Sequence, residues 1–374
     1  MILEGQRLID KAIADTGLDD FGNHPLVEPL NILVQSMNAA KDASELGRNH
    51  FKSSVCSALT TRLQIENYTT EHPDLLNGII EKPIFIVGLP RTGTTTLHHL
   101  LNQDKNNHTL RLWEAASPVP PPEEATYTTD PRVTKLRTAM SVGGEQMKEM
   151  RKLHLSDPEG PDECHLLFTR AIQTMEHPSL FHLPGYSEYI YSTNLNPLYA
   201  YHKRQLQLLQ YKKPGNWVLK APFHQMGLKA ILHTYPDAII VQTHRDPITL
   251  MASGASFGHM IRKPWNNNPD PNVSGRDWFT MVDTYIRHFK QDRALLEPPR
   301  QGQFLDVQYQ QLLSNPLEIV AKIYALAGRK ISDNARIDMQ NWMDNHPPNK
   351  HGKHEYRLKD YGITEQEVLD SFNQ

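Results

Sequence analysis

The spacing of hydrophobic residues divides the chain into a helical start and a longer region in which helices alternate with short strands. Between residue 1 and about residue 75, apolar residues recur at three- and four-residue intervals, as at Leu30, Leu33 and Val34. This spacing places them on one face of a helix, so it predicts a helical N-terminal region. We expect residues 76–374 to form the main domain, on which the helical region packs.

Compact apolar runs mark the expected strands. Residues 83–89 read Pro-Ile-Phe-Ile-Val-Gly-Leu, and their length, bounding proline and β-branched content indicate a buried parallel strand. Two further runs, at 217–220 and 238–243, flank a helical pattern from Met226 to His233. Strand, helix and strand in this order favour a parallel sheet. The expected fold class is therefore α/β, a P-loop-type parallel sheet flanked by helices, with a helical N-terminal region.

A phosphate-binding loop is predicted directly after the first of these strands. Residues 88–95 read Gly-Leu-Pro-Arg-Thr-Gly-Thr-Thr, which matches the template G-x-x-x-x-G-K-[ST] except that Thr94 replaces the lysine. Such a turn directs backbone N–H groups and the positive end of a helix at a phosphate. The lysine that reaches the β and γ phosphates of a nucleoside triphosphate is missing. Arg91, inside the loop, could instead hold oxygens of a transferring group.

The same residues could also form a glycine-containing turn and a threonine-rich helix start without any ligand. The position of the loop after an apolar strand favours the ligand-binding interpretation.

With this loop the chain resembles the sulfotransferases that depend on 3′-phosphoadenosine 5′-phosphosulfate (PAPS). Their 5′-phosphosulfate loop has a lysine or arginine ahead of Ser/Thr-Gly-Thr-Thr, and the arginine variety is more similar to the tyrosylprotein and bacterial branches than to the cytosolic phenol and steroid enzymes. The resemblance extends over about residues 83–360. It implies transfer of a sulfuryl group from PAPS to a hydroxyl of a small-molecule, lipid or carbohydrate acceptor. It also implies that the following loop residues bind PAPS: Arg91, Thr92, Gly93, Thr94, Thr95 and Thr96.

A second phosphate site is expected at the end of the run 238–243. Arg245 and Ser253 are eight residues apart, about two helical turns, so their side chains could meet one anion. In the resembled family an arginine and a serine at this spacing hold the 3′-phosphate. The simpler alternative pairs Arg245 with Asp246 or another acid.

Two later segments complete the resemblance. Residues 304–309 form a short strand entering a helix, and the resemblance places Tyr309 against the adenine, although glutamines follow it where the family has an acidic pair. A buried structural tyrosine is the alternative. Near the end of the chain, a basic stretch resembles the loop that closes over the 3′-phosphate, which implies roles for Lys350, Gly352 and Lys353. A solvated basic loop is the alternative there.

Sulfuryl transfer needs a base for the acceptor hydroxyl and cations for the sulfonyl oxygens. We expect Glu114 to be the base, because the tyrosylprotein and some bacterial enzymes have a catalytic glutamate in the corresponding stretch. Its alternative role is that of an ordinary helix-end glutamate. Lys220 ends an apolar strand and matches a family lysine that stabilises the sulfonate in transit. The cytosolic branch places a histidine two residues after that lysine; here that position is Pro222, and His224 is the reserve base.

Composition narrows the choice of partners. A formal charge of -3 and the lack of a dense Lys/Arg run argue against nucleic acid as a partner. Cys56 and Cys164 support neither a disulfide framework nor a thiolate zinc site. The acidic cluster at 157–165 is interpreted as a helix start rather than a metal site, and no metal is required. The chain start lacks an apolar leader and no stretch approaches the roughly 18 apolar residues of a membrane span. A cytoplasmic protein is expected.

Two other functions stay open at this point. A P-loop kinase or NTPase would need the loop lysine and an acid after an apolar strand, and the best such strand here reaches Arg245 before Asp246. A non-catalytic nucleotide-binding protein of the same fold would bind the nucleotide without transfer. The sequence identifies neither the acceptor nor the oligomeric state.

Overall fold

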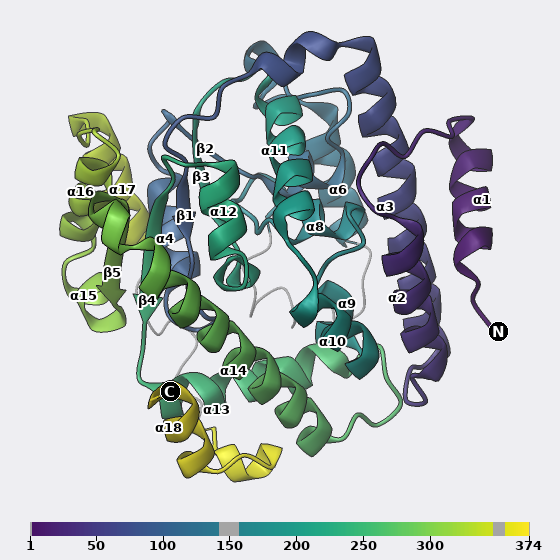
Figure 1. The fold of residues 1–374 in the computed structure, drawn as a ribbon. Helices are drawn as coiled ribbons and strands as arrows, with labels where there is room; N and C mark the ends of the chain where they lie inside the picture. Colours follow the sequence, from purple (N-terminus) through teal and green to yellow (C-terminus); the bar gives the residue numbers. More distant parts are fainter. Residues whose placement is uncertain (1, 142–156, 347–355, 374) are drawn as a thin grey trace. The chain divides into compact units, whose positions relative to one another are not determined.

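The computed structural model describes residues 2–141, 157–346 and 356–373, which form two compact units (Figure 1). The first unit combines three stretches of the chain: Met1–Ile79, Arg111–Pro214 and Gly258–Asp270. The second combines the remaining three: Ile80–Leu110, Gly215–Phe257 and Pro271–Gln374. The N-terminal region thus shares its unit with later stretches, and its standing as a domain of its own, residues 1–75, stays a prediction.

The described part of the first unit is helical. Its elements are α1 (Gly5–Thr16), α2 (Val27–Ala39), α3 (Glu45–Glu71), η1 (Pro73–Asn77), α5 (Leu112–Ala116), η2 (Glu124–Thr126), α6 (Pro131–Ser141), α8 (His165–Arg170), α9 (Glu176–Leu180), α10 (Pro184–Ser192) and α11 (Asn196–Gln210).

Local chemistry sets the bounds of the first helices. Gly17 ends α1 in the left-handed conformation, with φ 71°, and its N–H donates to the carbonyl of Ile13 at 2.7 Å. The Ser44 hydroxyl accepts from the N–H of Gly47 at 3.0 Å and so caps the start of α3. Leu8 and Ala12 of α1 are buried, as the helical spacing requires. The predicted helical N-terminal region is confirmed.

The second unit is built on a parallel sheet with the strand order β2-β3-β1-β4-β5. The strands are β1 (Ile84–Ile86), β2 (Asn107–Thr109), β3 (Asn216–Lys220), β4 (Ile239–His244) and β5 (Phe304–Gln308). The helices are α4 (Thr94–Leu101), η3 (Pro222–Gln225), α12 (Leu228–Thr234), α14 (Pro271–Leu296), η4 (Pro298–Gln303), α15 (Tyr309–Ser314), α16 (Pro316–Leu326), α17 (Asp333–Asn345), η5 (Leu358–Tyr361) and α18 (Glu365–Asn373), together with α13 (Pro247–Arg262) as far as Phe257.

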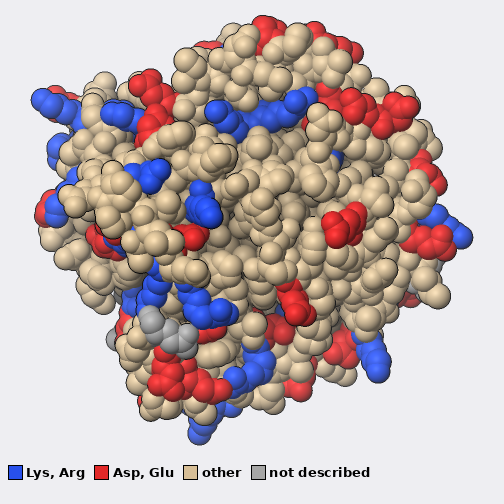
Figure 2. Space-filling model, viewed as in Figure 1, with Lys and Arg blue, Asp and Glu red and all other residues tan. Residues whose placement is uncertain are grey.

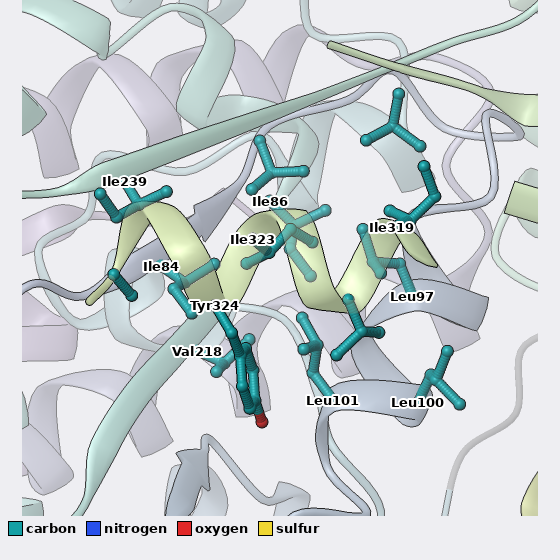
Figure 3. Close-up of a cluster of buried hydrophobic side chains, with 14 of the residues drawn as sticks. Ile84, Ile86, Leu97, Leu100, Leu101, Val218, Ile239, Ile319, Ile323 and Tyr324 are labelled. Atoms are coloured by element: carbon teal, nitrogen blue, oxygen red, sulfur yellow. The ribbon is translucent and has the colours of Figure 1, made fainter. Parts of the chain in front are cut away.

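Helices α4, α16 and α17 cover one face of this sheet. Figure 3 shows Ile84 and Ile86 of β1 among apolar side chains of α4 and α16, including Leu97 and Ile323. These side chains are completely buried. Successive strand residues point to opposite faces, so alternate residues of β1 form this core.

Helices α12 and α14 belong to the other face. Phe85, between Ile84 and Ile86, packs against the rings of His224 and Tyr235 at centroid distances of 5.0 and 5.4 Å. Phe223 of η3 in turn contacts Tyr285 of α14. The sheet is therefore covered on both faces, as an apolar parallel sheet requires. This confirms the predicted fold class.

The strands predicted at 83–89, 217–220 and 238–243 are all present, and the helix predicted between the last two begins at Leu228. The pattern gave no sign of β2, because its three residues, Asn-His-Thr, are polar yet buried. Among the helices of the described ranges, none is both long enough and apolar enough to cross a bilayer.

Candidate active site

Because the strands are parallel, their carboxyl ends meet at one edge of the sheet, where ligands bind in open α/β folds. β1 is central and leads into the loop 88–93. The neighbouring strands are in register with it, since Lys220 at the end of β3 pairs with Ile86. On the other side, β4 leads to Arg245 and β5 leads to Tyr309. The topology alone brings four of the predicted segments to one edge.

The loop after β1 has the geometry of an anion cradle. Gly93 precedes α4 with φ 93°, a left-handed conformation that glycine adopts without strain. A Cβ atom at Gly93 would lie 3.0 Å from the Tyr309 ring, so a larger residue would press on that side chain. Arg91 is itself left-handed, with φ 75°. The first N–H groups of α4, at Thr94, Thr95 and Thr96, point out of the helix start, where the helix dipole favours an anion.

Thr92 anchors this loop from inside. Its hydroxyl donates to the Leu89 carbonyl at 2.6 Å and lies 2.5 Å from the Thr243 hydroxyl of β4. A Cβ atom at Gly88 would overlap the Thr243 hydroxyl, so this position also requires glycine. The Thr92 side chain is therefore engaged within the protein, and the loop is fastened to β4.

Arg91, Ser253, Arg245 and Tyr309 form one connected group. The Arg91 Nε donates to the Ser253 hydroxyl at 3.1 Å, and the Arg245 Nη1 donates to the Arg91 carbonyl at 2.8 Å. The Arg245 guanidinium also lies over the Tyr309 ring, 4.5 Å from its centroid. The structure thus brings together residues that are up to 218 positions apart in the sequence, from Arg91 to Tyr309.

Asp246 has a separate structural task. Its carboxylate accepts from the Thr249 hydroxyl at 2.6 Å and from the Thr249 N–H at 2.8 Å, which lowers the pKa of Asp246. Asp246 therefore caps α13, which begins at Pro247 and carries Ser253. A proline suits the first helical position, and the cap explains why the helix begins there.

Lys220 and His224 are both buried at the end of β3. Lys220 is 2% exposed and is the last residue of the strand, and His224 in η3 is completely buried. The His224 ring stands at 86° to the Phe85 ring, which fixes its orientation.

Glu114 lies in the first unit, in surroundings of its own. It is completely buried, and its Oε2 accepts from the N–H of Arg111 at 3.0 Å at the start of α5. The neighbouring Tyr127 ring is flanked by the Arg111 guanidinium at 4.6 Å and the Lys213 ammonium at 4.3 Å. Burial, followed by the nearby Glu114 carboxylate, raises the pKa of Tyr127.

Tyr127 and Lys213 were not identified from the sequence. They are 13 and 99 residues from Glu114, and no motif links them. The predicted basic loop residues Lys350, Gly352 and Lys353 lie outside the described residues. Within the ranges that the structure describes, no group of three or more His, Cys, Asp or Glu side chains is arranged to hold a metal ion.

A parallel sheet whose central strand leads through a glycine-containing loop to a helix start is the architecture of P-loop-type proteins. Comparison with known proteins identifies the family within this class, because residues 83–333 match the model of the sulfotransferase family. This match covers more than half of the chain. The chain belongs to the sulfotransferase family.

Solved structures agree with this assignment. Sulfotransferase STF1 from Mycobacterium tuberculosis H37Rv is 30% identical, with a TM-score of 0.86 over 99% of this chain and 98% of that one. Sulfotransferase STF9 from Mycobacterium avium is 26% identical, with a TM-score of 0.90 over 98% and 94% of the two chains.

A curated relative from Mycobacterium bovis is 25% identical over 316 residues, 79% of this chain and 76% of its own length. It is named omega-hydroxy-beta-dihydromenaquinone-9 sulfotransferase Stf3. Together with the family match, these likenesses identify the chain as a sulfotransferase.

Proposed function

We propose that this chain transfers a sulfuryl group from PAPS to a hydroxyl of a small-molecule, lipid or carbohydrate acceptor. Members of the family in general use PAPS. The observation that carries the proposal for this chain is the connected group of Arg91, Arg245, Ser253 and Tyr309 beside the start of α4. It offers two separate sets of anion-binding groups and an aromatic ring at one edge of the sheet.

The 5′-phosphosulfate fits the loop. Backbone N–H groups of α4 and the hydroxyls of Thr95 and Thr96 are suited to the 5′-phosphate, since Thr95 is half-buried and Thr96 exposed. Arg91 is exposed and donates to Ser253 through Nε, so its two terminal nitrogens could hold the oxygens of the departing phosphate. The glycines at 88 and 93 give the backbone the close approach that such a cradle needs.

The 3′-phosphate and the adenine fit the neighbouring strand ends. Arg245 and Ser253 supply a guanidinium and a hydroxyl, and they are connected through Arg91 rather than through Asp246. Tyr309 offers a half-buried ring for stacking, on which the Arg245 guanidinium already rests. A nucleotide with phosphates at both the 3′ and 5′ positions would use both sets.

The transfer itself forms one S–O bond and breaks another. The acceptor hydroxyl oxygen attacks sulfur while the bond from sulfur to the 5′-phosphate oxygen breaks, which yields a sulfate ester and adenosine 3′,5′-bisphosphate (PAP). The hydroxyl proton passes to the base. Lys220 would stabilise the sulfonyl oxygens in transit, and Arg91 the phosphate oxygen that leaves.

Glu114 remains the proposed base, with His224 as the reserve. Glu114 is completely buried and accepts a hydrogen bond from the Arg111 N–H, which holds the carboxylate in place. His224 is also completely buried, and it shares the second unit with the phosphate loop. Neither side chain is excluded by its surroundings, so the two must be compared directly.

The expected partner of the enzyme is a small acceptor molecule with a hydroxyl group. Figure 2 shows basic and acidic side chains interspersed on the face it draws, which supports a small acceptor over nucleic acid. The curated relative is named for a substrate with an omega-hydroxy group, which supports a hydroxyl acceptor. A cytoplasmic location, PAPS as the donor and independence from metal are parts of this proposal.

The alternative of a P-loop kinase or NTPase finds less support. Thr94 stands where that class has its lysine, and Asp246, the acid after β4, is engaged as a helix cap. A non-catalytic nucleotide-binding protein would share every feature described so far except turnover.

Incubation with radiolabelled PAPS and an extract of cell metabolites separates these possibilities. The proposal predicts labelled products with the native chain and a loss of them with Arg91→Ala. Binding of PAP without transfer to any hydroxyl would favour the non-catalytic alternative. Transfer that is unaffected by Arg91→Ala would refute the proposed site.

A further inference from the structure

The ends of β4 and β5 carry a polar network that the proposed function does not use. Asp306 of β5 lies at its centre, opposite Gln242 in the strand register. Its Oδ1 is 2.6 Å from the Nε2 of His244, at the end of β4. Arg293 of α14 donates to both of its oxygens, at 2.7 and 2.6 Å. Asp306 therefore joins two strands and a helix.

Arg293 extends the network on both sides. Its Nη1 also donates to the Gln242 side chain of β4 at 2.6 Å, and its Nε donates to the Glu297 carboxylate at 2.6 Å. Burial alone would raise the pKa of Asp306, but the hydrogen bonds from Arg293 and His244 lower it well below its usual value. Asp306 is thus held as a carboxylate.

Side chains on both faces of the end of β4 form hydrogen bonds, because successive strand residues point to opposite faces. Gln242 and His244 point to the face with Arg293, and Thr243 points to the opposite face. There the Thr243 hydroxyl meets Thr92 of the phosphate loop. The strand end is held from both sides directly before Arg245.

The network also lies between the two residues that meet across the nucleotide site. Arg245 follows His244 immediately, and Tyr309 is three residues beyond Asp306. The Arg245 guanidinium lies 4.5 Å from the centroid of the Tyr309 ring. A bond between Asp306 and His244 therefore fixes the two strand ends from which these side chains extend.

The contact between Asp306 and His244 adds little to stability. Their side chains are 45% and 34% exposed, and an isolated ion pair at such exposure stabilises by at most about 1 kcal/mol. The pair of Asp306 and Arg293 is different, because Arg293 is 18% exposed and donates to both carboxylate oxygens. The hydrophobic cluster that contains Val241 and Val307 lies on the opposite face of the sheet. The bond between Asp306 and His244 restricts the direction in which the ends of β4 and β5 extend.

We propose that Asp306 is a positioning residue for the 3′-phosphate site, which acts by holding His244 and thereby the orientation of Arg245. This inference rests on the proposed function, because it assigns Arg245 to the 3′-phosphate. In this proposal Asp306 acts through its contacts with His244 and Arg293 and not through contact with the nucleotide.

Calorimetric titration of the full chain with PAP tests this role. Asp306→Asn keeps the size of the side chain but loses its charge, and it is expected to weaken PAP binding about tenfold, the scale of one charge-assisted hydrogen bond. In an Arg245→Ala background the same change should have less than about a twofold effect, because Asp306 acts through Arg245. The KM for PAPS should rise while kcat is unchanged.

Glu297→Gln is the matched control. It removes the other carboxylate on Arg293 without touching β4, so PAP affinity should stay at the wild-type level. His244→Ala is a second variant that removes the contact between Asp306 and His244 and leaves the pair of Asp306 and Arg293; it should weaken PAP binding in the same direction.

Three outcomes would overturn the inference: wild-type affinity in Asp306→Asn, equal losses in the presence and absence of Arg245, or an equal loss in Glu297→Gln. Failure of the wild-type chain to bind PAP would instead remove the proposed function. The two failures are therefore distinguishable.

Discussion

The two arginines of the sheet edge in the second unit and the buried polar residues of the first unit differ in how their side chains are held. At the sheet edge, Arg91 is exposed and Arg245 half-buried, and backbone geometry sets their positions. In the first unit, Glu114 and His177 are buried, each in its own surroundings, and tertiary packing sets their positions. The first arrangement presents charge to a ligand. The second encloses charge within the protein, and its chemistry depends on desolvation.

The largest expected effect is that of Arg91→Ala. If the loop arginine stabilises the departing phosphate, its loss lowers kcat by about two to three orders of magnitude, the scale for removing one charge-stabilising donor. The measurement is initial-rate kinetics with PAPS and an acceptor found in the labelling experiment. Arg7→Ala, at an exposed helix residue of the first unit, is the control. A fall of less than threefold would mean that Arg91 has no part in the transfer.

The second prediction tests whether the buried carboxylate of Glu114 is the base in the transfer. Glu114→Gln still accepts from the Arg111 N–H but cannot take up a proton, so kcat should fall about 100-fold with PAP affinity unchanged. Glu124→Gln, an exposed neighbour, should leave kcat intact. If His224→Gln abolishes turnover while Glu114→Gln does not, the reserve base replaces Glu114.

The third prediction compares how the stability of the two units changes at low pH. Burial lowers the pKa of His177 to about 4, and neither of its ring nitrogens has a hydrogen-bond partner among the described residues. The unfolded chain binds this proton near pH 6.5 and the folded chain does not. The contribution of His177 to the free energy of unfolding is therefore highest above pH 6.5, and it decreases as the pH falls toward 4, because the unfolded chain binds the proton first. From pH 7 to pH 5 the loss is about 2 kcal/mol.

Hydrogen exchange at pH 7 and pH 5 measures this difference by region. Protection should fall first in the helices of the first unit, because the histidines whose pKa burial lowers to about 4 or below, His24, His177 and His202, all lie there. His177→Phe should reduce the pH dependence, although His24 and His202 still contribute to it, and the same change at the exposed His346 should leave it unchanged. Equal loss of protection in both units would contradict this account.

The smallest effect concerns the phosphate loop. Gly93→Ala places a side chain at φ 93° and 3.0 Å from Tyr309, which costs about 1–2 kcal/mol. Thermal unfolding with and without PAP should show a lower midpoint and a smaller shift by the ligand. Gly302→Ala, where an added Cβ would meet nothing within 4 Å, should change neither. An unchanged shift in Gly93→Ala would show that the loop tolerates displacement of Tyr309.

The same contrast explains what could be predicted from the sequence. The strand, loop and helix around Arg91 are continuous in the chain, so their pattern predicts both the fold and the cradle. Arg245 and Ser253 are eight residues apart on one strand end and helix, and the structure brings both to Arg91. Local sequence contains this information because regular elements fix the spacing.

Long-range partners could not be predicted in this way. Asp306 meets His244 and Arg293 across 62 and 13 residues, and nothing near Asp306 signals the contact. Tyr127 and Glu114 are brought together by tertiary packing, and β2 lacks the apolar residues that mark the other strands. The role of Glu114 as the base stays a prediction for the same reason.

The central claim is that one edge of the sheet holds two separate phosphates of one adenosine, with an arginine where nucleotide kinases have lysine. Calorimetric titration of the full chain with PAP and, separately, with ATP tests it most directly. The account predicts that PAP binds at least about tenfold more tightly than ATP, since only PAP places a phosphate at Arg245. Equal affinity for the two nucleotides, or no binding of either, would contradict it.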